Sequence, residues 1–145
     1  MKYEKLEIAF IQLERALSLF FYENDYISTI TLAGAADEII GKIRERKGDT
    51  TAYKEHKKLH DYIFQTWFKT SPSDKKFNEI MNGIRNGLKH LRNGEVMEFN
   101  PEQEAVNILD RAIENYFSLT GNETDLMKKL KYYQLRPTYP VDEEK

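Results

Sequence analysis

The sequence has no cysteine, a single tryptophan, four prolines and seven glycines among its 145 residues. The lack of cysteine excludes disulfides, thiolate metal sites and cysteine nucleophiles. No apolar run approaches the roughly 18 residues that a membrane span needs. The first 20 residues include Glu4, Glu7 and Glu14, and a signal peptide would not carry these acidic residues. We therefore expect a soluble, cytoplasmic protein that makes no membrane contact.

Apolar residues recur at three- and four-residue spacing through most of the chain, a pattern typical of amphipathic helices. The few glycines and prolines fall between these stretches, where helices are expected to end. The pattern predicts an all-α fold, an antiparallel bundle of five to six helices, in one domain over 1–135. We expect an extended or mobile tail over 136–145. The expected helices span 3–23, 26–46, 51–69, 74–92, 101–120 and 124–135.

The net charge of −2 conceals an uneven distribution. Residues 1–41 hold three basic and seven acidic side chains, a net charge of −4. Residues 42–92 hold thirteen and six, a net charge of +7, and residues 93–145 hold six and eleven, a net charge of −5. Two interpretations are open. Either the three segments form solvent-exposed surfaces of different charge, or the middle segment forms a basic surface that binds a polyanion.

The fourth expected helix carries the run RNGLKH, residues 85–90. Arg85 can hold a phosphate through two parallel hydrogen bonds and stabilise the charge that develops on it. His90 can take or give a proton near neutral pH, and Asn86 adds a carboxamide. These groups suffice for phosphodiester transfer on RNA without a metal ion.

Helix geometry separates the two charged groups of this run. At about 100° per residue, Arg85 lies about 140° around the helix from His90. One straight helix therefore does not direct both side chains at one phosphate. Gly83 and Gly87 form a flat strip beside His90 that permits close approach of another backbone. We infer that a two-fold homodimer, in which both copies of this helix face each other, completes the site.

The run RNGLKH resembles the signature of HEPN domains, in which an arginine and a polar residue precede a histidine by a few positions. The all-helical setting also looks like that family, and the resemblance covers residues 1–120. It implies a metal-independent ribonuclease, acting as a toxin or in phage defence, with its site at a homodimer cleft and an antitoxin as a partner. Arg85 would bind the phosphate, Asn86 would be the polar residue of the motif, and His90 would be the acid/base. Where members paired with a nucleotidyltransferase antitoxin have a tyrosine, this chain has Arg92, so modification there is not supported.

The same bundle also fits a non-catalytic module that binds RNA, a nucleotide or a protein. Lys89 and Arg92 flank His90 and are candidates for RNA contact. A second basic cluster, with aromatic residues beside it, is formed by Lys128, Lys129 and Lys131. These lysines either contact RNA or face water while their helix packs Leu126, Leu130 and Tyr133 inward.

Two acidic residues are candidates for supporting the site. Glu79 shares the helix shoulder of His90, and Asp37 lies on the second expected helix between Gly34 and Gly41. Asp37 could orient His90 or Arg85 across the groove that these glycines leave. Alternatively, Asp37 pairs locally, for example with Arg44.

A metal site is the remaining alternative. His56 and His60 are four residues apart, which lets two imidazoles share a metal ion. With His90 as a third ligand the set resembles DinB-like metal-binding bundles, but the HExxH pattern of zinc proteases is absent. We favour no metal and no cofactor, with both histidines facing the core or flanking it. The apolar line beside them, which we expect to be buried, consists of Leu59, Ile63 and Trp67.

Overall fold

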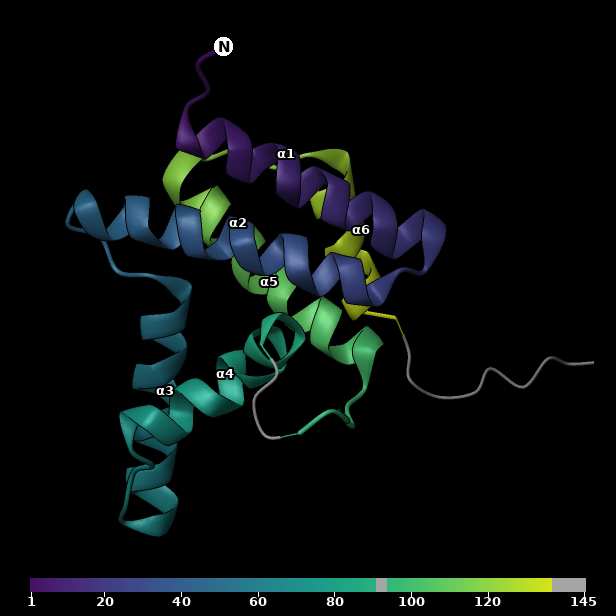
Figure 1. Cartoon of the computed structure of the whole chain (residues 1–145). Helices are drawn as coiled ribbons and strands as arrows, with labels where there is room; N and C mark the ends of the chain where they lie inside the picture. The colour runs from purple at the N-terminus through teal and green to yellow at the C-terminus, as the bar shows by residue number, and fades with distance from the viewer. Residues whose placement is uncertain (91–93, 137–145) are drawn as a thin grey trace, which may run out of the picture.

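The computed structural model describes residues 1–90 and 94–136, and these residues form six α-helices and one π-helical turn (Figure 1). No strand occurs within the described residues, which confirms the all-α fold expected from the sequence. The bounds of the helices also follow the expected ones closely. They are α1 (Lys5–Ser18) continued by η1 (Leu19–Glu23), α2 (Tyr26–Arg46), α3 (Ala52–Phe68), α4 (Asp74–Lys89), α5 (Pro101–Thr120) and α6 (Asp125–Gln134).

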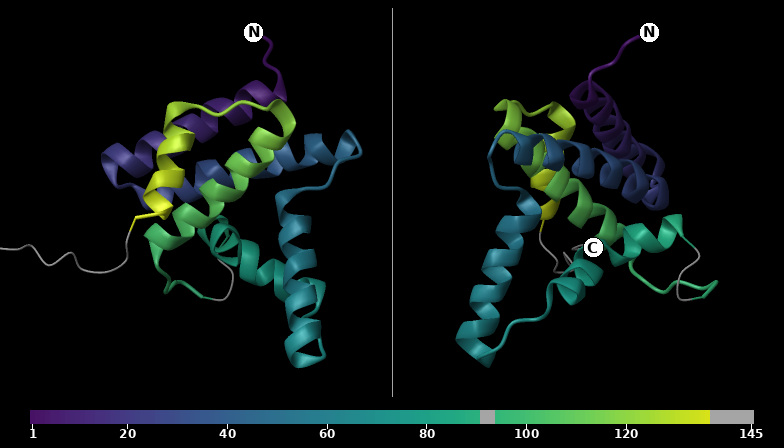
Figure 2. Two further views of the ribbon diagram at one scale, coloured as in Figure 1. Left: turned by 180° about the vertical axis from the view of Figure 1, so that it is seen from behind. Right: turned by 60° about the vertical axis from the view of Figure 1, so that its left-hand side comes forward.

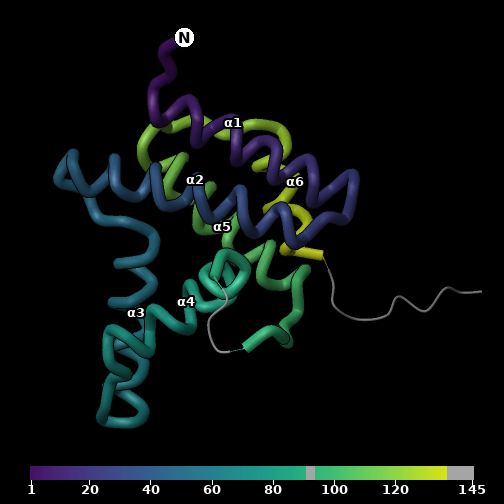
Figure 3. Tube along the Cα trace, viewed as in Figure 1, coloured from purple at the N-terminus to yellow at the C-terminus, as the bar shows by residue number. Residues whose placement is uncertain are grey.

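The hydrophobic core lies between α1, α2 and α5, with α6 packed against them (Figure 3). Each of these helices turns one apolar face inward, as its residue spacing predicts. Removal of this apolar surface from water is the main force that holds the four helices together. The fully buried side chains include Leu13, Leu17, Ile30, Ile40, Leu109, Met127 and Leu130.

Local capping explains where the helices begin and end. The side chain of Asn100 accepts a hydrogen bond from the Gln103 amide at 3.0 Å, and Pro101 follows at the first position of α5. The helix ends at Gly121, whose φ of 70° is a left-handed conformation that glycine adopts without strain. Ser73 accepts in the same way from the Lys76 amide at 3.2 Å and starts α4.

Helix α3 projects from the rest of the bundle, and α4 crosses it partway along and runs back to the bundle (Figure 2). Ala52, the first residue of α3, and Phe77, in the first turn of α4, are buried. The expectation that the apolar line of α3 faces the core is wrong, because Leu59 is 59% exposed and Trp67 is 76% exposed. In α4, Ile80 is likewise 57% exposed. The sequence pattern correctly identified one apolar face, but no other helix within the described residues covers it.

The expected tail lies outside the described residues except for Arg136. That side chain donates to Glu102 at 3.0 Å and stacks on the ring of Tyr133. Among the helices that the structure describes, none combines the length and apolar character needed to cross a lipid bilayer.

Candidate functional site

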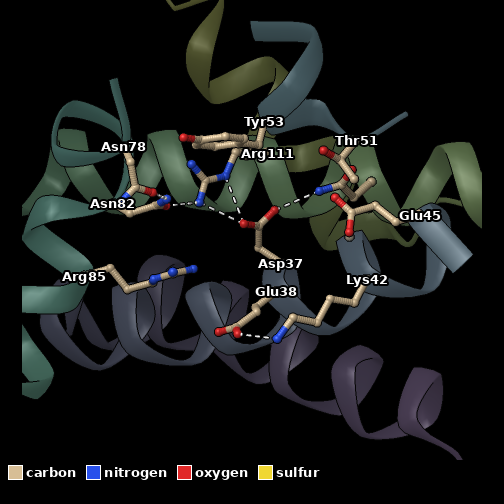
Figure 4. Close-up of a pocket in the computed structure, with 12 residues that line it drawn as sticks. Asp37, Glu38, Lys42, Glu45, Thr51, Tyr53, Asn78, Asn82, Arg85 and Arg111 are labelled. Atoms are coloured by element: carbon tan, nitrogen blue, oxygen red, sulfur yellow. Dashed lines mark hydrogen bonds and ion pairs between the residues drawn. The ribbon is translucent and has the colours of Figure 1, made fainter. Parts of the chain in front are cut away.

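A buried network of polar side chains joins α2, α4 and α5 at the place where α4 meets the bundle (Figure 4). Arg111 donates from Nε to Oδ2 of Asp37 at 2.9 Å and from Nη2 to Oδ1 of Asn82 at 2.7 Å. The other Asp37 oxygen accepts from Asn115 at 2.8 Å. Asn115 in turn accepts from Arg44 at 2.9 Å. The buried carboxylate of Asp37 and the buried guanidinium of Arg111 therefore neutralise each other, which a charge buried in a protein requires.

A cavity of about 240 Å³ opens above this network. Helix α2 contributes three carboxylates to its lining, and each has a cation of its own. Asp37 is paired with Arg111, Glu38 with Lys42 at 2.8 Å, and Glu45 with Lys54 at 3.1 Å. Arg85 also points into this cavity (Figure 4). It makes no ion pair with a carboxylate among the residues that the structure describes.

Arg85 is held in place by a hydrogen bond to a backbone carbonyl and not by an ion pair among the described residues. Its Nη1 donates to the carbonyl of Gly34 at 3.3 Å, and its buried Nε has no hydrogen-bond partner in the described part of the chain. The side chain passes so close to α2 that a Cβ on Gly34 would lie 2.3 Å from Cδ of Arg85. Burial and the nearby Arg111 lower the pKa of Arg85, while Asp37 and Glu38 oppose that shift. An anion in the cavity would supply the missing countercharge.

Arg85 and His90 do not share a cavity within one chain. His90 lies just past the end of α4, exposed, with its backbone amide donating to Asn86 at 3.1 Å. It lines a separate hollow of about 230 Å³ together with Gly94 and Glu95. Asn86 itself is half-buried. The divergence that helix geometry predicts for this motif is therefore present.

The glycine strip beside the motif is only partly open. A Cβ on Gly83 would meet nothing within 4 Å, whereas one on Gly87 would lie 2.5 Å from Cε of Met97. The connector after α4 thus covers one half of the strip. The other half permits the close approach that the sequence suggested.

The two supporting acids occupy different places. Asp37 pairs with Arg111, and neither Arg85 nor His90 is among its hydrogen-bond partners in the described residues. Arg44, the local partner considered for Asp37, bonds instead to Asp49 at 3.0 Å. Glu79 is exposed on α4.

The lysines named as RNA candidates differ in their availability. Lys89 is exposed beside His90, and Arg92 lies outside the described residues. Lys128 is exposed on α6. Lys129 lies over the rings of Phe21 and Tyr22, and Lys131 pairs with Glu123.

The apolar side of α6 faces the bundle: Leu130 is buried and Tyr133 packs against Phe20. Inward packing of α6 is therefore confirmed.

The two histidines of α3 are not arranged as a metal site. Nε2 of His56 lies 3.2 Å from Glu114, and His60 stacks on Phe64 with ring centroids 4.4 Å apart. No cluster of three or more metal-ligating His, Asp or Glu side chains occurs in residues 1–90 and 94–136. His56 does share a groove of about 340 Å³ with Arg85 and Arg111.

Sequence reasoning missed Arg111, Asn115 and Asn82. Arg111 and Asn115 are four residues apart on a second side of α5, next to the buried Ile108. Ile108 falls outside the main apolar line of that helix. The position of Ile108 could have indicated that α5 is buried on two sides. Polar residues next to it on the second side, such as Arg111 and Asn115, are then expected to be buried as well.

Comparisons with protein-family models, with curated proteins and with solved structures found no match to this chain.

Proposed function

We propose that this chain is a metal-independent endoribonuclease of the HEPN type, an effector of a toxin–antitoxin or phage-defence system. One observation carries the proposal. Arg85, the arginine of the motif, is the one cation lining the cavity without a carboxylate partner among the described residues. A half-buried guanidinium in that state favours binding of a phosphate.

The reaction follows from the two groups of the motif. His90, as the neutral imidazole, takes the proton from a 2′-hydroxyl whose oxygen attacks the adjacent phosphorus. The bond from phosphorus to the 5′ oxygen breaks, and the imidazolium passes its proton to that leaving oxygen. Arg85 holds the non-bridging oxygens, where negative charge increases in the transition state. The products are a 2′,3′-cyclic phosphate and a 5′-hydroxyl.

A second copy of the chain is part of this proposal. Arg85 and His90 of one chain line different hollows, so the reacting phosphate takes Arg85 from one copy and His90 from the other. The open half of the glycine strip at Gly83 provides room for a second α4. Two-fold symmetry would then create two equal sites for each dimer.

Cleavage of RNA in the presence of EDTA tests the proposal. We expect the wild-type protein to cut RNA, and Arg85→Ala and His90→Ala each to lose activity by about 100-fold or more. Lys42→Ala is the matched control, because Lys42 lines the same cavity but is paired with Glu38. It should retain activity. Loss of activity in EDTA, or equal loss in the control, would contradict a metal-independent role of Arg85.

A second candidate is an RNA-binding module without nuclease activity. It is favoured by the absence of any histidine among the described residues that line the cavity of Arg85. This candidate predicts RNA binding that depends on Arg85 but not on His90, with no cleavage products. His56→Ala belongs in the same series, because His56 shares the other groove of Arg85 and tests whether a single chain suffices.

A further inference from the structure

A chain of hydrogen bonds leads from the buried ion pair to the cavity of Arg85. Asn78, Asn82 and Arg85 occupy one face of α4, at spacings of four and three residues, and all three line that cavity (Figure 4). Arg111 donates from Nη2 to Oδ1 of Asn82 at 2.7 Å, and Nδ2 of Asn82 donates to Oδ1 of Asn78, also at 2.7 Å. These bonds connect Asn78 to the buried pair of Arg111 and Asp37.

The chemistry of these groups fixes which way each amide faces. A guanidinium only donates, so the atom of Asn82 that meets Arg111 must be its oxygen. The remaining nitrogen of Asn82 also only donates, so the atom of Asn78 that meets it must be an oxygen as well. Reversal of either amide would place two donors against each other. Asn78 therefore has its nitrogen Nδ2 left over as a donor, and no acceptor for it occurs among the described residues.

Asn78 and Arg85 lie seven residues apart, which is about 10 Å along the axis of α4. A nucleotide has its phosphate at one end and the Watson–Crick edge of its base at the other, with the sugar between them. A phosphate held by Arg85 can therefore direct the far edge of its base toward Asn78. We propose that Asn78 selects a base with a keto oxygen at that edge, uracil or guanine, over one with an amino group, cytosine or adenine. This inference rests on the proposed function for RNA as the substrate.

The selection depends on a penalty as well as on a bond. The keto oxygen of uracil accepts from Nδ2 of Asn78. The amino group of cytosine is itself a donor, so two donors would face each other and both would lose their hydrogen bonds to water. Rotation of the Asn78 amide does not remove this conflict, because it would break the bond with Asn82. The hydroxyl of Tyr53, which lines the same cavity, both donates and accepts, so it does not discriminate between the bases.

Binding of two short RNAs tests the inference without relying on cleavage. Fluorescently labelled oligouridylate and oligocytidylate of equal length are titrated separately with full-length His90→Ala protein, which does not cleave them under the proposed mechanism. Fluorescence anisotropy gives the two affinities. We expect oligouridylate to bind more tightly by about fivefold or more, the effect of one hydrogen bond made or lost. Comparison of this ratio between protein variants cancels any difference between the two RNAs themselves.

Asn78→Asp changes only the group that faces the base. The carboxylate still accepts from Asn82, but its second oxygen replaces the free donor by an acceptor. We expect the preference to reverse in favour of oligocytidylate, while the added negative charge weakens the binding of both RNAs. Asn78→Ala, which adds no charge, should bring the ratio to about one. Asn107→Asp is the matched control, because Asn107 also accepts from a side chain one turn away, Gln103 at 3.0 Å, but lines the other groove of Arg85. It should leave the ratio unchanged.

The outcomes separate this inference from the proposed nuclease. A ratio that stays the same in Asn78→Asp and Asn78→Ala, or that moves in Asn107→Asp or Tyr53→Phe instead, would overturn base selection by Asn78. Reversal of the ratio in Asn78→Asp together with no cleavage by the wild type supports base selection and contradicts the nuclease. Cleavage of both RNAs by the wild type with equal kcat/KM, and a ratio that Asn78→Asp does not change, contradicts base selection and leaves the nuclease intact.

Discussion

Two nitrogens of Arg111 contact one oxygen of Asp37, Nε at 2.9 Å and Nη2 at 2.8 Å. This ion pair connects α5 to α2. The cavity that receives Arg85 lies directly on this pair. Because Arg111 neutralises Asp37, that carboxylate does not neutralise Arg85. The buried pair therefore supports the site in two ways: it fixes the helices, and it leaves Arg85 without an ion pair to a carboxylate in the described part of the chain.

We predict that Asp37→Ala lowers the free energy of unfolding by about 3–5 kcal/mol, because it leaves the buried Arg111 unpaired. Urea denaturation followed by circular dichroism measures this. The double variant Asp37→Leu with Arg111→Met should recover much of the loss, since apolar residues of similar size replace both charges. A single-variant loss below about 1 kcal/mol would show that the pair is structurally unimportant.

Gly34→Ala should displace Arg85 without altering the motif. The new methyl group would lie 2.3 Å from Cδ of Arg85, so the arginine must leave its position against α2. We expect RNA cleavage to decrease while the circular dichroism spectrum stays unchanged. Gly41→Ala is the control on the same helix, where a Cβ comes no closer than 3.7 Å to the side chain of Thr51. It should keep its activity and be stabilising by about 0.5–1 kcal/mol. Full activity in Gly34→Ala would contradict the placement of Arg85.

The structure also predicts how Glu104 affects stability with pH. Burial raises the pKa of Glu104, and Arg111 only partly opposes this. The stability from its protonated form is present below the pKa of the unfolded chain and is lost as the pH rises through the higher folded value. Glu104→Gln stays neutral, so its stability relative to wild type should increase as the pH rises above about 4.3, the ordinary pKa of a glutamate in an unfolded chain. Urea denaturation at a series of pH values measures this difference. If Glu104 were fully solvated, the difference would not change with pH.

Residue spacing and capping residues sufficed to predict the helices. Asn100 followed by Pro101 starts α5 as expected, and Gly121 ends it. These signals are local, because each depends on a few neighbouring residues and their backbone hydrogen bonds. The divergence of Arg85 and His90 was predictable for the same reason, since it follows from the helix period alone.

Features that depend on several helices were not predictable in this way. The spacing of Leu59, Ile63 and Trp67 identifies an apolar face but does not say whether another helix covers it. Similarly, Asp37 was recognised as a candidate, yet its partner lies 74 positions away on α5. A pairing of that kind is set by how α2 and α5 pack, which no local pattern encodes.

The most direct test of the shared site mixes two inactive proteins. Arg85→Ala and His90→Ala are unfolded together at equal amounts, refolded to allow exchange of subunits, and assayed for RNA cleavage in EDTA. A mixed dimer would hold one intact site, with Arg85 from one copy and His90 from the other. We predict that the mixture regains about a quarter of wild-type activity, because half of the dimers are mixed and each has one of two sites. A mixture that stays inactive beside an active, identically refolded wild type would contradict a site shared between two copies.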